Sequence, residues 1–342
     1  MNDRSIAILN TGLVTSVGLS APATCAAIRA KISNPTETRF IDSNGEWIMA
    51  HQVQLEKPWR GRAKLAKMAA MAIEECLEGV ERSEWAGIPL LLCVAEKERP
   101  GRMEGLDDRL LIDIEDELKT NFGSDSAVFA YGRASFLMAM AGARKLLLED
   151  SHSCVLIATA DSLLNWPTLM QFEQEGRLLT AQNSNGFLPG EAGGAVLVSS
   201  AESEAQSICA GIGFATELTP LGSDAPSRGT GIAKAIENAL ADSECAMHEL
   251  DLRIADISGE QYYFREATLA VSRLLRQRKE TFDLWHPAEC AGETGAAAGF
   301  IMTATAIAAG RKGYLEGSNV LIHLANDSGA RAAAVLRAGA IE

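Results

Sequence analysis

Residues 185–198 read NGFLPGEAGGAVLV, a glycine-rich turn that leads into a continuous apolar run. An apolar run without alternating polar residues is typical of a strand that is buried on both faces of a sheet. Similar short runs occur along the chain and alternate with segments of helical periodicity. This alternation predicts an α/β protein.

The order of these segments occurs twice, which indicates an internal duplication. Each copy has a strand that ends in a glycine turn, a helix with an apolar stripe, a helix rich in small residues, and two further strands. The segments are residues 5–12, 65–77, 134–148, 154–158 and 195–198 in the first copy, and 207–211, 232–240, 295–309, 319–324 and 332–336 in the second. The helices rich in small residues carry few charges, so we expect them to lie buried between two sheets.

Several motifs resemble those of β-ketoacyl-acyl-carrier-protein synthases, the condensing branch of the thiolase fold. Residues 185–198 resemble that family's DGFVxGEGAGxLVL segment, and GETGAAAG at 292–299 resembles its GHxxGAAG segment. The other matching segments are IAILNTGLVTSVG at 6–18, RASFLMAMAGA at 133–143, ISGE at 257–260 and a reduced acyl gate, HLANDSGAR, at 323–331. The resemblance covers nearly the whole chain. It implies an α/β thiolase fold with duplicated βαβαβαββ halves, residues 1–200 and 201–342, in one compact αβαβα layered sandwich.

The residues at the family's catalytic positions differ in this chain. Arg133 matches the nucleophilic Cys, and Ser258 and Glu293 match the two His. A condensing enzyme needs a thiolate, whose pKa falls at a helix N-terminus, and donors that stabilise an oxyanion. A guanidinium stays protonated and is no nucleophile, and an ionised Glu repels developing negative charge. We therefore expect the chain to have no catalytic residues for condensation and not to be an enzyme of this kind.

Arg133 poses a problem of its own, because a cation is disfavoured at a helix N-terminus and a buried unpaired charge is costly. In the family, the positions of Arg133 and Glu293 lie close together. We expect the two residues to form an ion pair that fills the former active site. In the alternative arrangement, Arg133 points along a residual channel to solvent and Glu293 forms hydrogen bonds elsewhere.

Other reactive side chains give weaker signals. His286 and Cys290 lie near Glu293 in sequence and could form a relocated dyad, although a buried Cys beside a loop His is the simpler interpretation. No two His share ligand spacing with a carboxylate, so we predict no metal, and the glycines at 211–213 lack the rest of a dinucleotide motif, so we predict no cofactor. His323 should be a core or loop residue. We expect surface positions for His51, His152 and His248.

Charge and composition restrict the partners. The 342 residues carry a net charge of −14, which argues against nucleic acid and anionic membranes, and is unfavourable for docking an acidic acyl carrier protein. No apolar run approaches the ~18 residues that cross a bilayer, and the first residues show no signal-peptide pattern. The seven scattered Cys are typical of reduced thiols in a cytoplasmic protein.

Two surface features have open interpretations. Residues 106–122 have the pattern of an amphipathic helix whose acidic face is either solvated or a docking site for a basic partner. The aromatic run Tyr262, Tyr263 and Phe264, with Trp285 nearby in sequence, either forms a binding patch or packs at the mouth of the former pocket.

Three functions follow. The first is a protein-recognition scaffold, because short thiolase-like proteins without catalytic residues resemble co-chaperones of bacterial type VI secretion effectors. Such a chain would form a homodimer through the strand near residues 127–130 and bind a secretion adaptor or effector. The second is a non-catalytic subunit similar to a chain-length factor, paired with an active ketosynthase that an acyl carrier protein serves. The shortened segment 96–125 and the altered gate at 325–331 count against it. The third is an acyl-transfer enzyme with relocated catalytic residues.

Overall fold

The computed structural model describes residues 4–150, 152–200 and 205–338. The first half of the chain forms β1 (Ile6–Val14), α1 (Ala21–Arg29), β2 (Thr36–Ile41), β3 (Trp47–Ala50), α2 (Gly61–Cys76), β4 (Leu90–Cys93), α3 (Leu110–Leu118), β5 (Ala127–Phe129), α4 (Ser135–Leu148), β6 (Cys154–Ser162), α5 (Trp166–Gln174) and β7 (Glu191–Ser199). The second half forms β8 (Ser207–Thr216), α6 (Thr230–Ser243), β9 (Leu252–Ala255), α7 (Gln261–Leu274), β10 (Leu284–Trp285), α8 (Ala288–Ala291), α9 (Ala298–Arg311), β11 (Asn319–Ala325) and β12 (Ala330–Ala338).

The strand order confirms the internal duplication. The large sheet runs β10-β9-β11-β12-β8-β1-β7-β6-β4-β5. From the middle of this sheet outward, the first half has the order β1, β7, β6, β4, β5 and the second half has the order β8, β12, β11, β9, β10. If the strands of each half in this sheet are numbered along the chain, both orders are first, fifth, fourth, second, third. In both halves the first two neighbouring pairs are antiparallel and the last two are parallel. The halves join where β1 pairs with β8 over a short stretch, Ile6 to Ile8 against Cys209 to Ser207.

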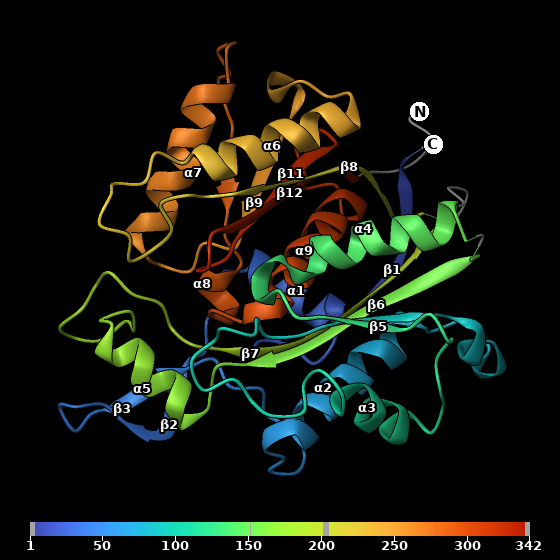
Figure 1. The fold of residues 1–342 in the computed structure, drawn as a ribbon, viewed down its shortest axis with the longest axis horizontal. Coiled ribbons are helices and arrows are strands. Elements are labelled where there is room, and N and C mark those ends of the chain that lie inside the picture. The colour runs from blue at the N-terminus through green and yellow to red at the C-terminus, as the bar shows by residue number, and fades with distance from the viewer. Residues whose placement is uncertain (1–3, 151, 201–204, 339–342) are drawn as a thin grey trace.

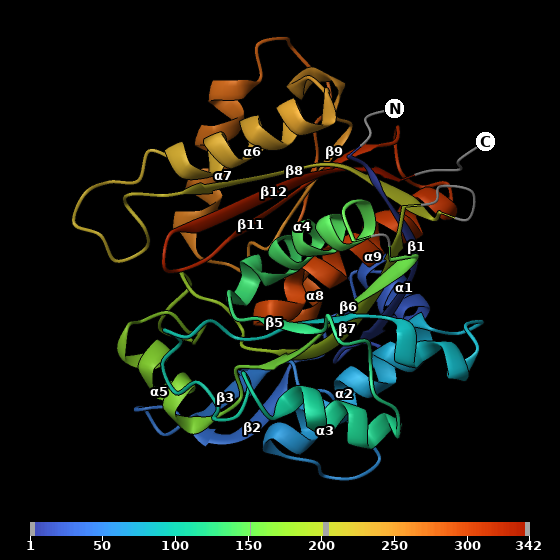
Figure 2. The same cartoon turned by 45° about the vertical axis from the view of Figure 1, so that its right-hand side comes forward.

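The sheet folds back on itself and gives the layers that the sequence predicted. Helices α4 and α9 lie between its two parts, α2 and α3 cover the outer face of one part, and α6 and α7 cover the outer face of the other (Figure 1). A second view shows the same five layers, with α4 and α9 side by side in the centre (Figure 2). The expected boundary between residues 200 and 201 adjoins residues 201–204, which lie outside the described residues.

The signature stretch 185–198 explains how these layers come so close. A Cβ atom added to Gly193 would lie 2.6 Å from the backbone oxygen of Met68 in α2. One added to the next residue, Gly194, would lie 2.7 Å from the Phe300 Cβ in α9. Strand β7 is thus packed against a helix on each face, and only glycine fits at these two positions.

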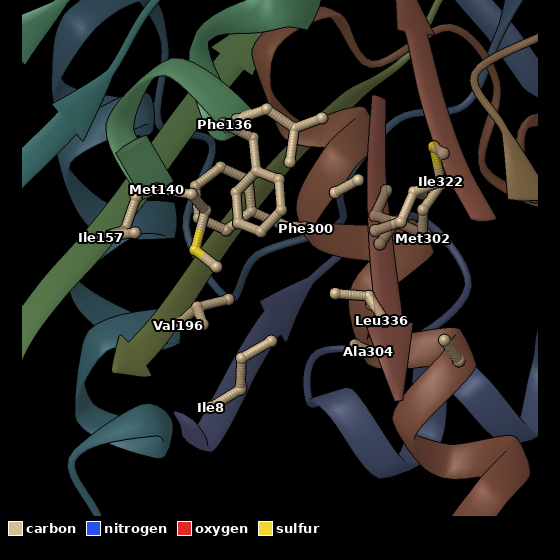
Figure 3. Packing of buried hydrophobic residues seen from close by; sticks show 14 of the residues in the cluster. Ile8, Phe136, Met140, Ile157, Val196, Phe300, Met302, Ala304, Ile322 and Leu336 are labelled. Carbon is tan, nitrogen blue, oxygen red and sulfur yellow. The ribbon is translucent and has the colours of Figure 1, made fainter. Parts of the chain in front are cut away.

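The central helices pack through aromatic and small side chains. The rings of Phe136 in α4 and Phe300 in α9 lie 4.6 Å apart between centroids, and both side chains are fully buried. Around them Figure 3 shows Met140, Ile157 and Val196, which α4, β6 and β7 contribute. This core fixes the N-terminal ends of α4 and α9 next to each other, where the candidate site lies.

No helix in the described ranges is long and apolar enough to span a membrane.

Candidate functional site

The structure brings together the three residues that the sequence resemblance matched to catalytic positions. Arg133 lies in the short turn before α4, Glu293 lies just before the matching turn at α9, and Ser258 follows β9. The Arg133 Nη1 atom is 3.4 Å from Glu293 Oε2, and Ser258 Oγ donates a hydrogen bond of 3.0 Å to the same oxygen. Arg133 and Glu293 are 5% and 6% exposed, so the contact is inside the protein rather than in a channel open to solvent.

Arg133 has more partners than the one expected from the sequence. Its Nη2 atom donates to Tyr263 Oη at 2.9 Å and to Asp327, and its guanidinium lies 4.7 Å above the centroid of the Tyr263 ring. Asp256 Oδ2 lies 3.8 Å from its Nε atom. Three carboxylates and an aromatic face therefore surround one buried cation. We call Arg133, Asp256, Tyr263, Glu293 and Asp327 the Arg133 cluster.

The three carboxyl groups of the cluster have different proton affinities. Burial alone would raise the pKa of Asp327, but Arg133 and Arg177 more than offset it and hold that pKa well below its usual range. Burial raises the pKa of Asp256 to about 7, although Arg133 acts in the opposite direction. Burial also raises the pKa of Glu293, against the favourable effects of Arg133 and the Gly295 amide. The cluster thus holds one firmly charged carboxylate and two that bind a proton more readily.

Glu293 also offsets the unfavourable position of the Arg133 cation at the start of a helix. Its Oε1 atom accepts a hydrogen bond of 2.9 Å from the Gly295 amide at the start of the turn before α9. A carboxylate is favourable at that end of a helix, because the N-terminus carries partial positive charge. The cation at the start of α4 is therefore compensated by an anion at the start of α9.

A second charged group, absent from the sequence predictions, supports both helix starts. Arg99 is buried and binds Glu96 at 2.8 Å and Asp161 at 2.7 Å. These carboxylates lie against Gly132 and Gly295, which have φ of +54° and +58° and occupy matching turns. A Cβ at either glycine would come within 2.2 Å of a carboxylate oxygen. Arg99 thus links the two turns that position Arg133 and Glu293.

The cluster adjoins a cavity of about 550 Å³. Arg177 lies at its wall and binds Glu260 at 2.8 Å and Asp327 at 2.7 Å. Since Asp327 also binds Arg133, the charged groups form a continuous chain from the cavity wall to Arg133. Phe172 and Leu221 supply apolar parts of the wall.

The other candidates are placed elsewhere. His286 Nδ1 lies 4.0 Å from Glu289 Oε2, and its ring meets Phe264 edge-on at 5.6 Å. Cys290 is buried, and burial raises the pKa of its thiol to about 11. No hydrogen bond joins His286 to Cys290 in the described part of the chain. These contacts do not activate a thiol.

One histidine prediction was wrong. His51 is fully buried, because the chain after β3 forms a bridge to Gly190 beside the signature stretch. Burial lowers the pKa of its ring to about 4. His323 is buried in β11, as expected, and burial lowers the pKa of its ring to about 3. Within the described ranges, no group of three or more His, Cys, Asp or Glu could hold a metal ion.

The two surface features are resolved in part. The acidic segment forms a helix, α3, that is shorter than residues 106–122 and ends at Lys119 in a left-handed conformation. Its Asp113 and Glu117 pair with Arg62 and Lys67 of α2, so half of its acidic face is used inside this chain. The aromatic run divides: Tyr263 joins the Arg133 cluster, whereas Phe264 is 37% exposed.

Comparisons with known proteins agree with this architecture. No protein-family model matches the chain. The curated "Putative polyketide beta-ketoacyl synthase 2" of Streptomyces coelicolor is 28% identical over 225 residues, which cover 61% of this chain and 53% of that protein. The match therefore spans about half the length of this relative.

Solved structures match over nearly the whole chain. The ishigamide ketosynthase/chain length factor matches with a TM-score of 0.81 at 16% identity, over 98% of this chain and 99% of that one. A ketosynthase in complex with its chain length factor from Xenorhabdus doucetiae matches with a TM-score of 0.80 at 12% identity, over 98% of both chains. The fold is the thiolase fold of the ketosynthases. A type II polyketide acyl-carrier protein complex with its ketosynthase also matches, with a TM-score of 0.80 at 16% identity, over 98% of this chain and 99% of that chain.

Proposed function

We propose that this chain is the non-catalytic subunit of a ketosynthase pair, similar to a chain length factor. The Arg133 cluster is the observation that carries this proposal. A protonated guanidinium stands where the family has its nucleophile, and three carboxylates and a tyrosine hold it there. Neither a thiol nor an imidazole is present at the three matching positions, so the chain would act through its partner's chemistry.

The similar proteins support this function better than a protein-recognition scaffold or an acyl-transfer enzyme with relocated catalytic residues. Two of the structures named above contain a ketosynthase together with a chain length factor. The shortened segment 96–125 had argued against such a role. The structural match to the ishigamide protein nevertheless covers 99% of that chain with a TM-score of 0.81. The type VI secretion role and the acyl-transfer activity remain predictions without such support.

Strand β5 offers a surface for the partner subunit. It is the last strand of the large sheet, so one of its edges has no neighbouring strand among the described residues. Ala127 is exposed, Val128 and Phe129 are half-buried, and Tyr131 just beyond is 49% exposed. An edge strand with apolar side chains is a template for pairing with another sheet. The sequence predicted a homodimer through this strand. We propose instead that the same edge binds a ketosynthase, because two of the similar structures contain a ketosynthase together with a chain length factor.

The charge distribution supports docking of the acyl carrier protein on the partner. Basic residues of α2 are already engaged within this chain, since Arg62 pairs with Asp113 and Lys67 pairs with Glu117. Lys64 pairs with the buried Glu191. With these cations neutralised and a net charge of −14, this chain offers little attraction for an acidic carrier protein.

Affinity capture from the native host, with mass spectrometry of the co-eluting proteins, tests the proposal. The expected partner is a ketosynthase that retains its nucleophilic Cys. Tyr131→Glu and Ala127→Glu should reduce its recovery at least tenfold, because each places a charge on the apolar edge. Ile112→Glu is the matched control, since Ile112 is 45% exposed but lies on α3. Recovery of a secretion adaptor or effector, without a ketosynthase, would instead support the scaffold function.

A further inference from the structure

A separate cavity of about 180 Å³ lies where α1 of the first half meets the second half. Residues of the α1 end, of β10 and α8, and of α9 and its following loop enclose it: Ile28, Arg29, Lys31, Trp285, His286, Pro287, Glu289, Thr305 and Tyr314. Helix α8 separates this cavity from the Arg133 cluster, because Pro287 and Glu289 line the cavity whereas Glu293 follows the far end of the helix. Helices α1, α8 and α9 can be followed in Figure 2.

The inner surface of the cavity fits an aromatic ring. Trp285 and Tyr314 are half-buried and nearly parallel, with 6.2 Å between ring centroids and 25° between planes. Ile28 is buried and lines the same cavity. An apolar cavity of ~150 Å³ is large enough for benzene, so this one accommodates a single substituted ring.

The rim of the cavity carries an exposed cation, Arg29, in the last turn of α1. The guanidinium of Arg29 lies 4.1 Å from the centroid of the Tyr314 ring, and both residues line the cavity. The one carboxylate that lines the cavity, Glu289, is already paired with Lys31. Within the described ranges, Arg29 has no ion pair. A planar guanidinium held in this way favours a carboxylate, to which it can donate two parallel hydrogen bonds.

We propose that this cavity binds a small aromatic monocarboxylate. Its ring packs against Trp285 and Ile28, and its carboxylate meets the Arg29 guanidinium. The ring supplies apolar burial, and the anion pairs with a guanidinium that has no ion pair in the described ranges. The site is distinct from the Arg133 cluster and does not depend on pairing with a ketosynthase.

Calorimetric titration of the full chain with three probes tests the proposal. Benzoate has both the ring and the charge, benzyl alcohol has only the ring, and acetate has only the charge. Benzoate should bind at least tenfold more tightly than either of the others, because hydrogen bonds between charged groups add to the apolar contact.

Variants assign the binding to this cavity. Arg29→Gln should weaken benzoate binding about tenfold and leave benzyl alcohol binding unchanged, whereas Trp285→Ala should weaken both. Arg39→Gln is the matched control, because Arg39 is exposed and also lies over an aromatic ring, that of Phe40 at 5.0 Å. The melting temperature of each variant shows that the fold is kept. Benzoate affinity no higher than that of benzyl alcohol, or equal losses in Arg29→Gln and Arg39→Gln, would overturn the proposal.

Discussion

Replacing Arg133 by methionine should destabilise the protein, and the loss should depend on pH. Methionine keeps an unbranched side chain but is shorter than arginine, so it removes the charge, its donors and the contact with the Tyr263 ring. Removing one partner of a buried ion pair typically costs about 3–5 kcal/mol, because the remaining charge is left uncompensated. Arg133 is 5% exposed and contacts three carboxylates, so we expect a loss in this range at pH 7.5.

The loss can be expressed as a melting temperature. An unfolding entropy of ~2.1 cal/mol/K per residue gives about 0.7 kcal/mol/K for 342 residues. A loss of about 3–5 kcal/mol then lowers the melting temperature by about 4–7 °C. At pH 5.5 the orphaned carboxyl groups bind protons more easily. Each additional proton bound by the folded variant reduces the cost by about 2.7 kcal/mol over these two pH units.

Differential scanning calorimetry at the two pH values checks this prediction. Arg133→Met with Glu293→Gln should recover at least half of the loss at pH 7.5, because one orphaned charge is gone. Arg109→Met is the control, since the Arg109 side chain is 65% exposed and the carboxylate beside it, that of Asp108, lies 3.9 Å away; its effect should be below ~0.5 kcal/mol. A neutral or stabilising Arg133→Met at pH 7.5 would refute the reasoning, because it would mean that the cluster carries no uncompensated charge.

Three further predictions concern the same buried groups. The folded-state pKa of Asp256 is raised from 3.8 to about 7, so its contribution to stability is complete below pH 3.8 and is lost as the pH rises to about 7. Asp256→Asn keeps the neutral form, and urea titrations should show a shallower fall in unfolding free energy between pH 5 and 8, by about 1–3 kcal/mol. The pKa of His51 is lowered from 6.5 to about 4, so its contribution to stability is present above pH 6.5 and is lost as the pH falls to about 4. In His51→Leu the melting temperature should therefore depend less on pH over that range than in the natural chain. An unchanged pH dependence of the melting temperature would contradict this. Arg133→Cys should not become acylated by an acyl thioester at pH 7, because neighbouring carboxylates raise the pKa of the new thiol; stoichiometric acylation in intact-mass spectra would contradict this.

The sequence predicted the architecture because burial leaves a strong pattern. Continuous apolar runs marked the paired strands, and the few charges in residues 134–148 and 295–309 marked the two central helices. The glycines of 185–198 were recognisable as a motif, although only the structure shows that Gly193 and Gly194 admit a helix on each face of β7. Short elements such as β10, with two residues, leave no periodicity to detect.

The candidate site was predictable only where a motif marked it. Arg133, Ser258 and Glu293 occupy recognisable positions, and the structure places them in contact. Tyr263 and Asp327 lie 130 and 194 residues from Arg133 in the chain, and no local pattern identifies them as its partners. The sequence predicted a surface position for His51 because a lone polar residue is usually exposed. Its burial depends on a bridge to Gly190, which lies far along the chain.

Intact-mass spectrometry of the paired subunits tests the central claim most directly. This chain would be co-expressed with a Cys-containing ketosynthase and incubated with an acyl-loaded carrier protein. We expect a heterodimer in which the acyl mass appears on the ketosynthase alone, because the sequence resemblance matches Arg133 to the nucleophilic Cys of ketosynthases. An acyl adduct on this chain, at Cys290 or elsewhere, would contradict the account and show that it has retained acyl chemistry.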